Sequence, residues 1–545
     1  MILDKNLLRG TAILTASIFI SKILGIIYIF PFQAMVGLEG LALYTYGYNP
    51  YTIFLSLSTL GIPIAISKFI SKYNALEDHQ TVQRLFRSGI IVMSITGLVA
   101  FSLLFFLAEP IARQFLNTDD LGSNSISDAV FTIRMVSTAL LIIPIMASIR
   151  GYFQGFGMMG PTAISQVIEQ LVRIVFILVL SFLILEVWNG EISSAVGVAM
   201  FGAFVGAAGA LIVLILYYVK NKDSLIKMNE TAPAKEKIPL KKMYKELLSY
   251  ALPISFVGLA IPLYQWIDLT SFNSAMTQVG YAMEEAEMYL GAFTQAVHKL
   301  ILIPVSIATA MSLTIIPTVT KAFTTKDYDT LQKQITQTFQ IILFFALPAS
   351  AGLILLSDSA YGSLYSLSDI QIGGELLRYY APVAILFSLF AVCTSLLQGI
   401  DRQKFSVIAL FVGLLFKYLF NTPFITWFGP IGAVLATGVG YSLSLGIILW
   451  TIGKYGPYNY KFILKRLLLI GMFTAIMGIV VILIRNGLGI FLPLETKVNA
   501  FTILIVSTTA GLAAYMFLTI RSGLAGQILG QRFNFLKKKK QRATQ

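Results

Sequence analysis

Six cationic side chains lie inside segments that are otherwise apolar, and they are the strongest candidates for functional residues in this sequence. They are Lys22, Arg134, Arg173, Lys299, Arg378 and Lys417. Only two acids, Glu169 and Asp268, lie in such segments, so the balance is 6 − 2 = +4. A charge on a membrane helix costs at least about 2.5–3.5 kcal/mol by insertion scales, so it normally faces a cavity or a partner. A cavity with this excess of positive charge should attract an anion.

The spacing of the charges predicts some of their partners. Glu169 and Arg173 are four residues apart, so they share one helix face and we expect them to pair. Lys417 has no acid at the corresponding position, where Gly413 stands. We therefore expect Asp268 to be the partner of Lys417.

The other four cations differ in their expected depth. Arg134 and Arg378 lie near the outer ends of their segments, where snorkelling to lipid headgroups and facing a cavity both remain open. Lys22 and Lys299 lie deeper, so we expect both to face a central cavity.

The composition indicates a helical protein that crosses a membrane many times. The chain has 545 residues, 57% of them hydrophobic and 12% charged, with a mean hydropathy of +0.79. One cysteine and two histidines argue against a disulfide and a metal cluster. The net charge of +14 lies in short loops between apolar runs, where it sets topology, so we expect neither a nucleic-acid partner nor a cofactor.

Fourteen apolar runs predict fourteen transmembrane helices. Sorting the basic residues by loop places both termini in the cytoplasm and leaves the outer loops acidic, with Asp119, Asp120 and Asp128 in one and Glu284, Glu285 and Glu287 in another. The predicted spans are 11–36, 44–70, 88–108, 129–150, 161–185, 194–219, 246–272, 289–318, 334–356, 376–398, 405–427, 431–452, 465–484 and 498–519.

An internal repeat organises these spans. Arg134 and Arg378, and likewise Arg173 and Lys417, correspond at an offset of 244 residues. The pair Gln83-Arg84 corresponds to Gln332-Lys333 at an offset of 249. Since six spans precede the long polar linker, we predict two parallel six-helix lobes related by a pseudo-twofold axis. The predicted parts are an N-lobe 1–219, a basic cytoplasmic linker 220–245, a C-lobe 246–452, two extra helices within 453–519 and a polybasic cytoplasmic tail 520–545.

Three sequence motifs resemble those of the MurJ-type lipid II flippases. They are SKILG (Ser21–Gly25), HKLILIP (His298–Pro304) and IIPTVTK (Ile315–Lys321). This family belongs to the MOP superfamily, with the MATE exporters and Wzx flippases, and the chain is most similar to its SpoVB/YtgP-like branch. The resemblance implies that Lys22 and Lys299 stand where the family has cavity arginines, with charge kept but without the bidentate fork.

The same resemblance bears on a metal site. Some relatives hold sodium in the second lobe, and Asp268, Asn421 and Thr437 match such positions. Lys417 lies among them, so its ammonium group would take the place of the ion, and we expect no metal there.

The resemblance implies a transporter rather than an enzyme. The substrate would be lipid II or another undecaprenyl-pyrophosphate-linked glycan, as in capsule, teichoic or O-antigen synthesis, moved between leaflets of a bacterial cytoplasmic membrane by alternating access. A MATE-type drug exporter would need a cavity of opposite charge, and a membrane glycosyltransferase would need carboxylates or histidines at a membrane face. Membrane lipids and cell-wall synthesis proteins are the expected partners of a monomer.

Overall fold

The computed structural model describes residues 5–59, 61–116, 122–230, 252 and 255–529, and every regular element in these ranges is a helix. The chain divides into two compact units, Met1–Gly291 and Ala292–Gln545. The second half of the predicted linker, the start of the predicted seventh span and the tail from residue 530 lie outside the described residues. The predicted lobe boundary at 220–245 therefore stays a prediction.

Eleven helices in the described ranges are long and apolar enough to cross a membrane, or twelve if a bent pair counts as one span. The bent pair is Ile370–Tyr380 with Val383–Gly399, which meet at 45°. This confirms an all-helical, multi-pass membrane protein. The fourteen spans predicted from the sequence are more than the eleven or twelve found in the described residues. One candidate, Ala16–Thr59, runs across the two helices in which spans 1 and 2 were predicted.

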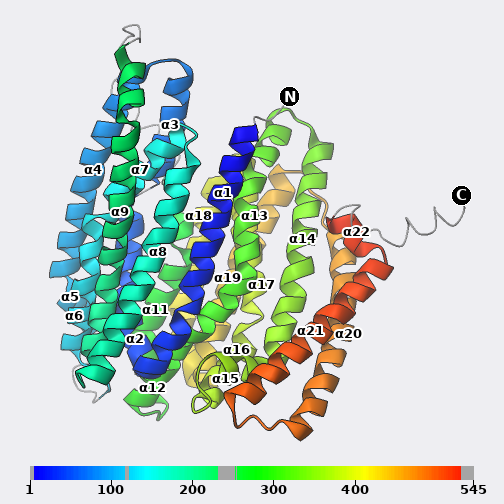
Figure 1. Ribbon diagram of the computed structural model, residues 1–545. Helices are drawn as coiled ribbons and strands as arrows, with labels where there is room; N and C mark the ends of the chain where they lie inside the picture. The colour runs from blue at the N-terminus through cyan, green and yellow to red at the C-terminus, as the bar shows by residue number, and fades with distance from the viewer. Residues whose placement is uncertain (1–4, 60, 117–121, 231–251, 253–254, 530–545) are drawn as a thin grey trace, which may run out of the picture. The chain divides into compact units, whose positions relative to one another are not determined.

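Unit 1 contains the helices from α1 to α12 (Figure 1). Within α2, Gly37 adopts φ 69° and ψ −175°, which interrupts the helix where only glycine fits readily. The helices are α1 (Lys5–Ile27), α2 (Ile29–Thr59), α3 (Ile62–Ala75), α4 (His79–Phe106), α5 (Ala108–Phe115), α6 (Ile126–Ser137), η1 (Thr138–Leu141), α7 (Ile143–Gly155), α8 (Met159–Phe182), η2 (Leu183–Val187), α9 (Ile192–Glu230), α11 (Ala260–Gln278) and α12 (Met283–Gly291).

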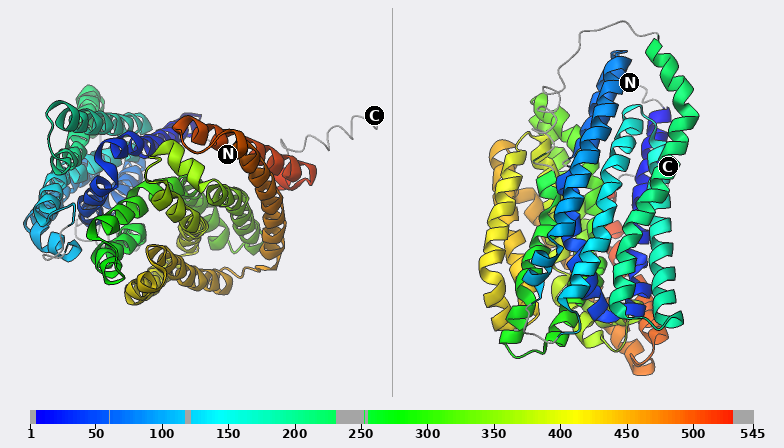
Figure 2. Two further views of the ribbon diagram at one scale, coloured as in Figure 1. Left: turned by 90° about the horizontal axis from the view of Figure 1, so that it is seen from below. Right: turned by 90° about the vertical axis from the view of Figure 1, so that its left-hand side faces the viewer.

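Unit 2 continues the helix of α12 through the π-helical turns of η3. In this unit α20 and α21 pair with each other, and α20 also packs along α14 (Figures 1 and 2). The elements are η3 (Ala292–Val297), α13 (His298–Thr324), α14 (Tyr328–Leu355), α15 (Ser357–Leu364), α16 (Ile370–Tyr380), α17 (Val383–Gly399), α18 (Gln403–Phe428), α19 (Ile431–Tyr455), α20 (Lys461–Phe491), α21 (Lys497–Arg521) and α22 (Leu524–Leu529).

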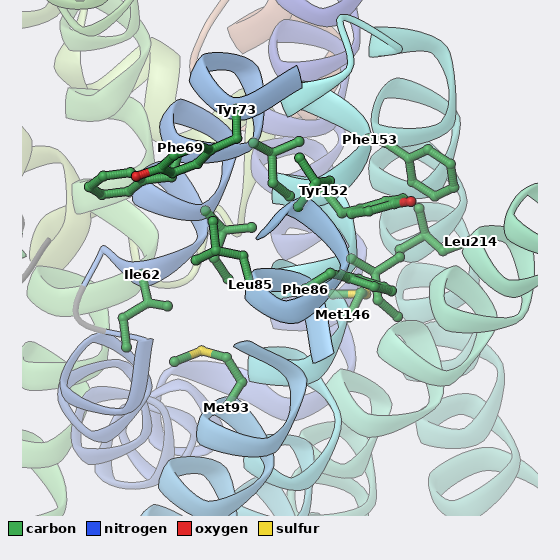
Figure 3. Packing of buried hydrophobic residues seen from close by; sticks show 14 of the residues in the cluster. Ile62, Phe69, Tyr73, Leu85, Phe86, Met93, Met146, Tyr152, Phe153 and Leu214 are labelled. Carbon is green, nitrogen blue, oxygen red and sulfur yellow. The ribbon is translucent and has the colours of Figure 1, made fainter. Parts of the chain in front are cut away.

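A hydrophobic core joins α3, α4, α7 and α9 in unit 1 (Figure 3). Phe86 and Tyr152 belong to this core, and their ring centroids lie 4.0 Å apart. Gly151 allows α7 to approach α3, because a Cβ atom there would lie only 2.4 Å from the Pro63 carbonyl oxygen. This core fixes α7, and α7 in turn carries Arg150 toward α8.

Helix bounds repeat between the two halves of the sequence. α6 and α16 begin 244 residues apart (370 − 126), as do α8 and α18 (403 − 159), while α4 and α14 begin 249 apart (328 − 79). The caps repeat too: Asp78 accepts from the Thr81 amide at 3.0 Å and Asp327 from the Thr330 amide at 3.1 Å. Hydrogen bonds from Thr330 lower the pKa of Asp327. These are the offsets at which the sequence itself repeats.

Candidate functional site

The most developed polar site in unit 1 surrounds Arg173 on α8. Arg173 lies fourteen residues after the start of α8 at Met159, or about 21 Å along the helix. Four tyrosines surround it: Tyr28 at the break between α1 and α2, and Tyr44, Tyr48 and Tyr51 on α2. The three on α2 follow an i, i+4, i+7 spacing, which places them on one helix face. We call these five residues the Arg173 site.

The geometry of the Arg173 site suits an anion. The guanidinium donates to the Tyr44 hydroxyl at 3.2 Å and lies over the Tyr48 ring, 5.6 Å from its centroid. The Tyr28 and Tyr44 hydroxyls share a hydrogen bond of 2.9 Å. The Nε atom of Arg173 is buried, yet no hydrogen-bond partner for it exists among the described residues. A guanidinium with an unused donor and hydroxyls beside it can bind a phosphate oxygen.

The predicted pair between Glu169 and Arg173 is wrong. The Glu169 carboxylate instead accepts from Arg150 on α7 at 2.8 Å, and Arg150 Nε also donates to the Ser165 hydroxyl at 2.9 Å. Arg150 is the last residue of the predicted span 129–150, and the close packing of α7 brings it to α8. Because Glu169 pairs with Arg150, it does not compensate the positive charge of Arg173, which can then attract an anionic ligand.

Breaking the Arg150–Glu169 pair is expected to destabilise the protein. In a double-mutant cycle with Arg150→Gln and Glu169→Gln, we expect a coupling energy of about 1.5–3 kcal/mol, since the bond is charged and both side chains are largely buried, at 13% and 21% exposure. Thermal unfolding of the purified protein measures it. The matched control is Arg113 with Glu109, an exposed pair for which we expect almost no coupling; equal coupling in both cycles would contradict this account.

The second repeat has its own buried cation. Lys417 on α18 is fully buried, donates to the Thr437 hydroxyl and to the Ala433 carbonyl at 3.4 Å, and lies 5.9 Å from the Phe293 ring centroid. Asn421, one turn along α18, is fully buried as well. Lys417, Asn421 and Thr437 thus lie within one unit. Asp268 is buried in the other unit, so its pairing with Lys417 stays a prediction.

The Thr437 hydroxyl is expected to contribute to stability through Lys417. Thr437→Val removes the acceptor of a fully buried ammonium group, so we expect the free energy of unfolding to fall by about 1.5–3 kcal/mol. Thr451→Val is the control on the same helix, because Thr451 is equally buried but its hydroxyl bonds only its own helix, at Ile447. Equal losses in the two variants would show that Lys417 plays no part.

The other four predicted cations are all more exposed than Lys417. Lys22 is exposed on α1, and no hydrogen bond or ion pair reaches it from the described part of the chain. Arg134 is exposed, with its guanidinium 5.1 Å from the Phe105 ring centroid. Arg378 is exposed and pairs with Asp358 at 2.9 Å. Lys299 is half-buried on α13.

A buried carboxylate lies on the opposite face of α2. Glu287 on α12 is fully buried, contrary to its prediction as an outer-loop acid. It accepts from the Asn124 amide at 3.2 Å and the Tyr46 hydroxyl at 3.4 Å, and Asn273 of α11 donates to that hydroxyl at 2.8 Å. We call these four residues the Glu287 cluster. It ties α2 to α11 and α12, two helices that the sequence repeat assigns to the second lobe.

Unit 2 contains an apolar pocket of about 360 Å³ between α13, α14, α20 and α21. Its walls are aliphatic and aromatic, with Leu300, Phe344, Met477, Val481 and Tyr515 among them. Such a pocket can hold hydrocarbon.

Sequence reasoning located Arg173 but missed its surroundings. The tyrosines follow a helical spacing in YTYGYNPY, from Tyr44 to Tyr51, and this spacing was the available signal. It predicts an aromatic face but does not say which helix that face meets. Arg150 and Glu287 gave no signal, because each stands at or beside the end of a predicted span, where a charged residue is ordinary.

Two family models match the chain. The model described as "Polysaccharide biosynthesis protein" matches residues 7–323, and the model "MatE" matches residues 281–422. Among solved structures, "Lipid II flippase MurJ, inward closed conformation" superposes with a TM-score of 0.65 at 18% identity, covering 95% of this chain and 99% of that one. "Crystal structure of MATE in the straight conformation" gives 0.59 at 14% identity, covering 83% and 96%. These likenesses show the fold.

Curated relatives cover almost the whole chain. "Lipid II flippase MurJ" of Bacillus subtilis (strain 168) is 45% identical over 97% of this chain and 98% of its own length. "Stage V sporulation protein B" of the same organism is 23% identical over 84% and 85%. The chain therefore belongs to the polysaccharide biosynthesis protein family of the MOP superfamily and, within it, to the family of the Bacillus subtilis lipid II flippase MurJ.

Proposed function

We propose that this protein flips lipid II from the inner to the outer leaflet of the bacterial cytoplasmic membrane. The observation that carries the proposal is the Arg173 site, a cation with an unused buried donor amid tyrosine hydroxyls. Lipid II carries a pyrophosphate, which such a site can bind. The relative that is 45% identical over nearly its full length bears the same function in its name. No covalent bond is made or broken, so the protein is a transporter.

The proposed architecture has fourteen transmembrane helices in two parallel lobes, with α20 and α21 as an addition. The recurrence of helix bounds at offsets of 244 and 249 supports the repeat. The count is supported by the eleven candidates together with the bent pair, the interruption of Ala16–Thr59 near Gly37, and α11, which adds Ala260–Gln278. The cytoplasmic location of both termini rests on the distribution of positive charge.

In the proposed mechanism the cations neutralise the pyrophosphate while the sugar-peptide head crosses. Arg173 binds the phosphate in the first lobe, and Lys22 and Lys299 add positive charge without the bidentate fork. Arg134 lies against the Phe105 ring and Arg378 pairs with Asp358, so we assign both to the membrane surface rather than to the substrate. Lys417 links α18 to α19 within unit 2 through the Thr437 hydroxyl and the Ala433 carbonyl. By the resemblance stated above, its ammonium group takes the place of the sodium ion that some relatives hold.

We propose that access alternates and that the Glu287 cluster, which lies within unit 1, holds α2 to α11 and α12 when the outer end is closed. By the predicted topology the cluster lies toward the outer face, where it binds α2 of the first lobe to α11 and α12. Opening to the outside then requires these hydrogen bonds to break. The apolar pocket of unit 2 suits a stretch of the polyprenyl chain.

A flippase for another polyprenyl-linked glycan is the second candidate, since all such substrates share the phosphate. The positive charge of the Arg173 site disfavours a MATE-type exporter of organic cations, although the fold is similar.

Complementation tests the substrate. Cells depleted of their own lipid II flippase would express the wild type or Lys299→Ala, and an impermeant probe would quantify lipid II in the outer leaflet. We expect the wild type to restore outer lipid II and the variant to restore much less. If the inserted wild type restores none, lipid II is not the substrate and another polyprenyl-linked glycan takes its place. If the variant restores as much, Lys299 has no role in the cavity.

A further inference from the structure

A second pocket opens at one end of unit 2; it is polar and has a volume of about 800 Å³. It lies where α14 and α20 begin and where α22 contributes Gln527, the end that the topology places on the cytoplasmic side (Figure 1). Four cations and one acid line it, so its charge is 4 − 1 = +3: Lys333, Lys461, Lys465, Arg466 and Asp329. Nothing in the transport mechanism above uses this pocket.

Hydrogen bonds between separate elements hold the walls of this pocket in place. Gln332 of α14 donates to the Pro457 carbonyl at 2.9 Å, and the Thr336 and Tyr458 hydroxyls share a bond of 2.8 Å. Arg466 of α20 donates to the Gln527 side chain of α22. Burial raises the pKa of Tyr458, so its hydroxyl stays neutral. The pocket is therefore built by α14, α20, α22 and the loop between α19 and α20.

An apolar stripe on α20 continues directly from the cations of the pocket. Lys461 and Lys465 begin a series with steps of three or four residues, which is one face of a helix. The following members of that series are all large, hydrophobic and exposed: Leu468, Met472, Ile476, Ile479 and Leu483. On a membrane-spanning helix such a stripe faces the hydrocarbon of lipid. One face of α20 thus presents cations first and an apolar surface after them.

We propose that this pocket binds the headgroup phosphate of an anionic phospholipid of the membrane, with its acyl chains along the apolar stripe of α20. The order of charge and hydrocarbon along the helix matches the order within a phospholipid. A clustered basic pocket between helices on the cytoplasmic side is suited to such headgroups. A soluble phosphate would use the pocket but gain nothing from the stripe. The site is independent of the proposed transport function.

Lipid binding to the purified full-length protein tests this assignment. Native mass spectrometry would compare dioleoyl phosphatidylglycerol with dioleoyl phosphatidylcholine, whose phosphate is neutralised by choline. We expect phosphatidylglycerol to bind more tightly to the wild type. Lys461→Gln with Lys465→Gln should weaken it by about 5-fold per lysine, or about 30-fold together. Lys461→Arg with Lys465→Arg, which keeps both charges, should restore binding and show that the fold is intact.

The matched control removes two exposed lysines elsewhere in unit 2, Lys326 and Lys404, which do not line the pocket. We expect Lys326→Gln with Lys404→Gln to change phosphatidylglycerol binding by less than about twofold, because screened surface charges contribute little. An equal loss in both double variants would overturn the site, as would equal binding of the two lipids by the wild type. Displacement of bound phosphatidylglycerol by inorganic phosphate would identify a soluble anion as the ligand and also overturn it.

Discussion

Replacing Arg173 with glutamine is expected to reduce transport by roughly 30-fold or more, because removing one partner of a desolvated charge pair costs about 2–5 kcal/mol. Arg173 has a buried Nε donor with no partner in the described residues, and it stands beside the Tyr28 and Tyr44 hydroxyls. Its glutamine variant keeps a polar side chain but loses the charge. The rate at which substrate reaches the outer leaflet measures the effect.

Arg134→Gln is the matched control for this prediction. Arg134 is also an arginine on a helix of the first lobe, but it is exposed and lies against Phe105. We expect its transport rate to stay within about twofold of the wild type, since exposed charges are worth little. If Arg134→Gln is as inactive as Arg173→Gln, total positive charge rather than the Arg173 site determines transport.

Replacing Glu287 with alanine should open the Glu287 cluster and shift the protein toward the outward-open state. The substitution leaves the Asn124 amide and the Tyr46 hydroxyl without their acceptor in a buried place, at a cost of about 1–3 kcal/mol each. The two groups together cost at least about 2 kcal/mol, so the closed state should lose population by about 30-fold or more. Reaction of a cysteine introduced at Ala275, a buried residue of α11 outside the cluster, with an impermeant maleimide measures the opening, in a background where Cys393 is replaced by alanine.

Glu284→Ala is the control for the Glu287 variant, because Glu284 is an exposed carboxylate on the same helix. We expect its labelling rate to match that of the parent cysteine protein. Equal labelling of the Glu287→Ala protein and the parent, with the same thermal stability, would show that the cluster does not hold the outer end closed.

The helical architecture and the internal repeat could be predicted from the sequence, because both depend on properties that are local or periodic. Long apolar runs predict membrane helices, and the offsets of 244 and 249 found in the letters recur in the helix bounds. The choice of Arg173 also came from a local property, a cation at membrane depth. Its equivalent Lys417 is fully buried beside Thr437, whereas the sequence had predicted Asp268 as its partner.

The partners of the charged side chains could not be predicted from the sequence, because they depend on which helices pack against each other. Glu169 has Arg173 one turn away on its own helix, yet its carboxylate bonds to Arg150, which the tight α3–α7 packing at Gly151 brings close. Neighbouring tyrosines of α2 likewise serve opposite faces, Tyr44 toward Arg173 and Tyr46 toward Glu287. A one-dimensional pattern gives the face of each residue but not the helix against which it packs.

The central claim is that a positively charged site carries a lipid-linked pyrophosphate across the membrane. Its most direct test uses purified protein in liposomes containing fluorescent lipid II, with the label on the outer surface quantified over time for the wild type and Arg173→Gln. The account predicts rapid exchange of lipid II by the wild type, slow exchange by the variant and no acceleration by a cationic dye. Equal exchange by both proteins, or transport of the dye in place of lipid II, would contradict it.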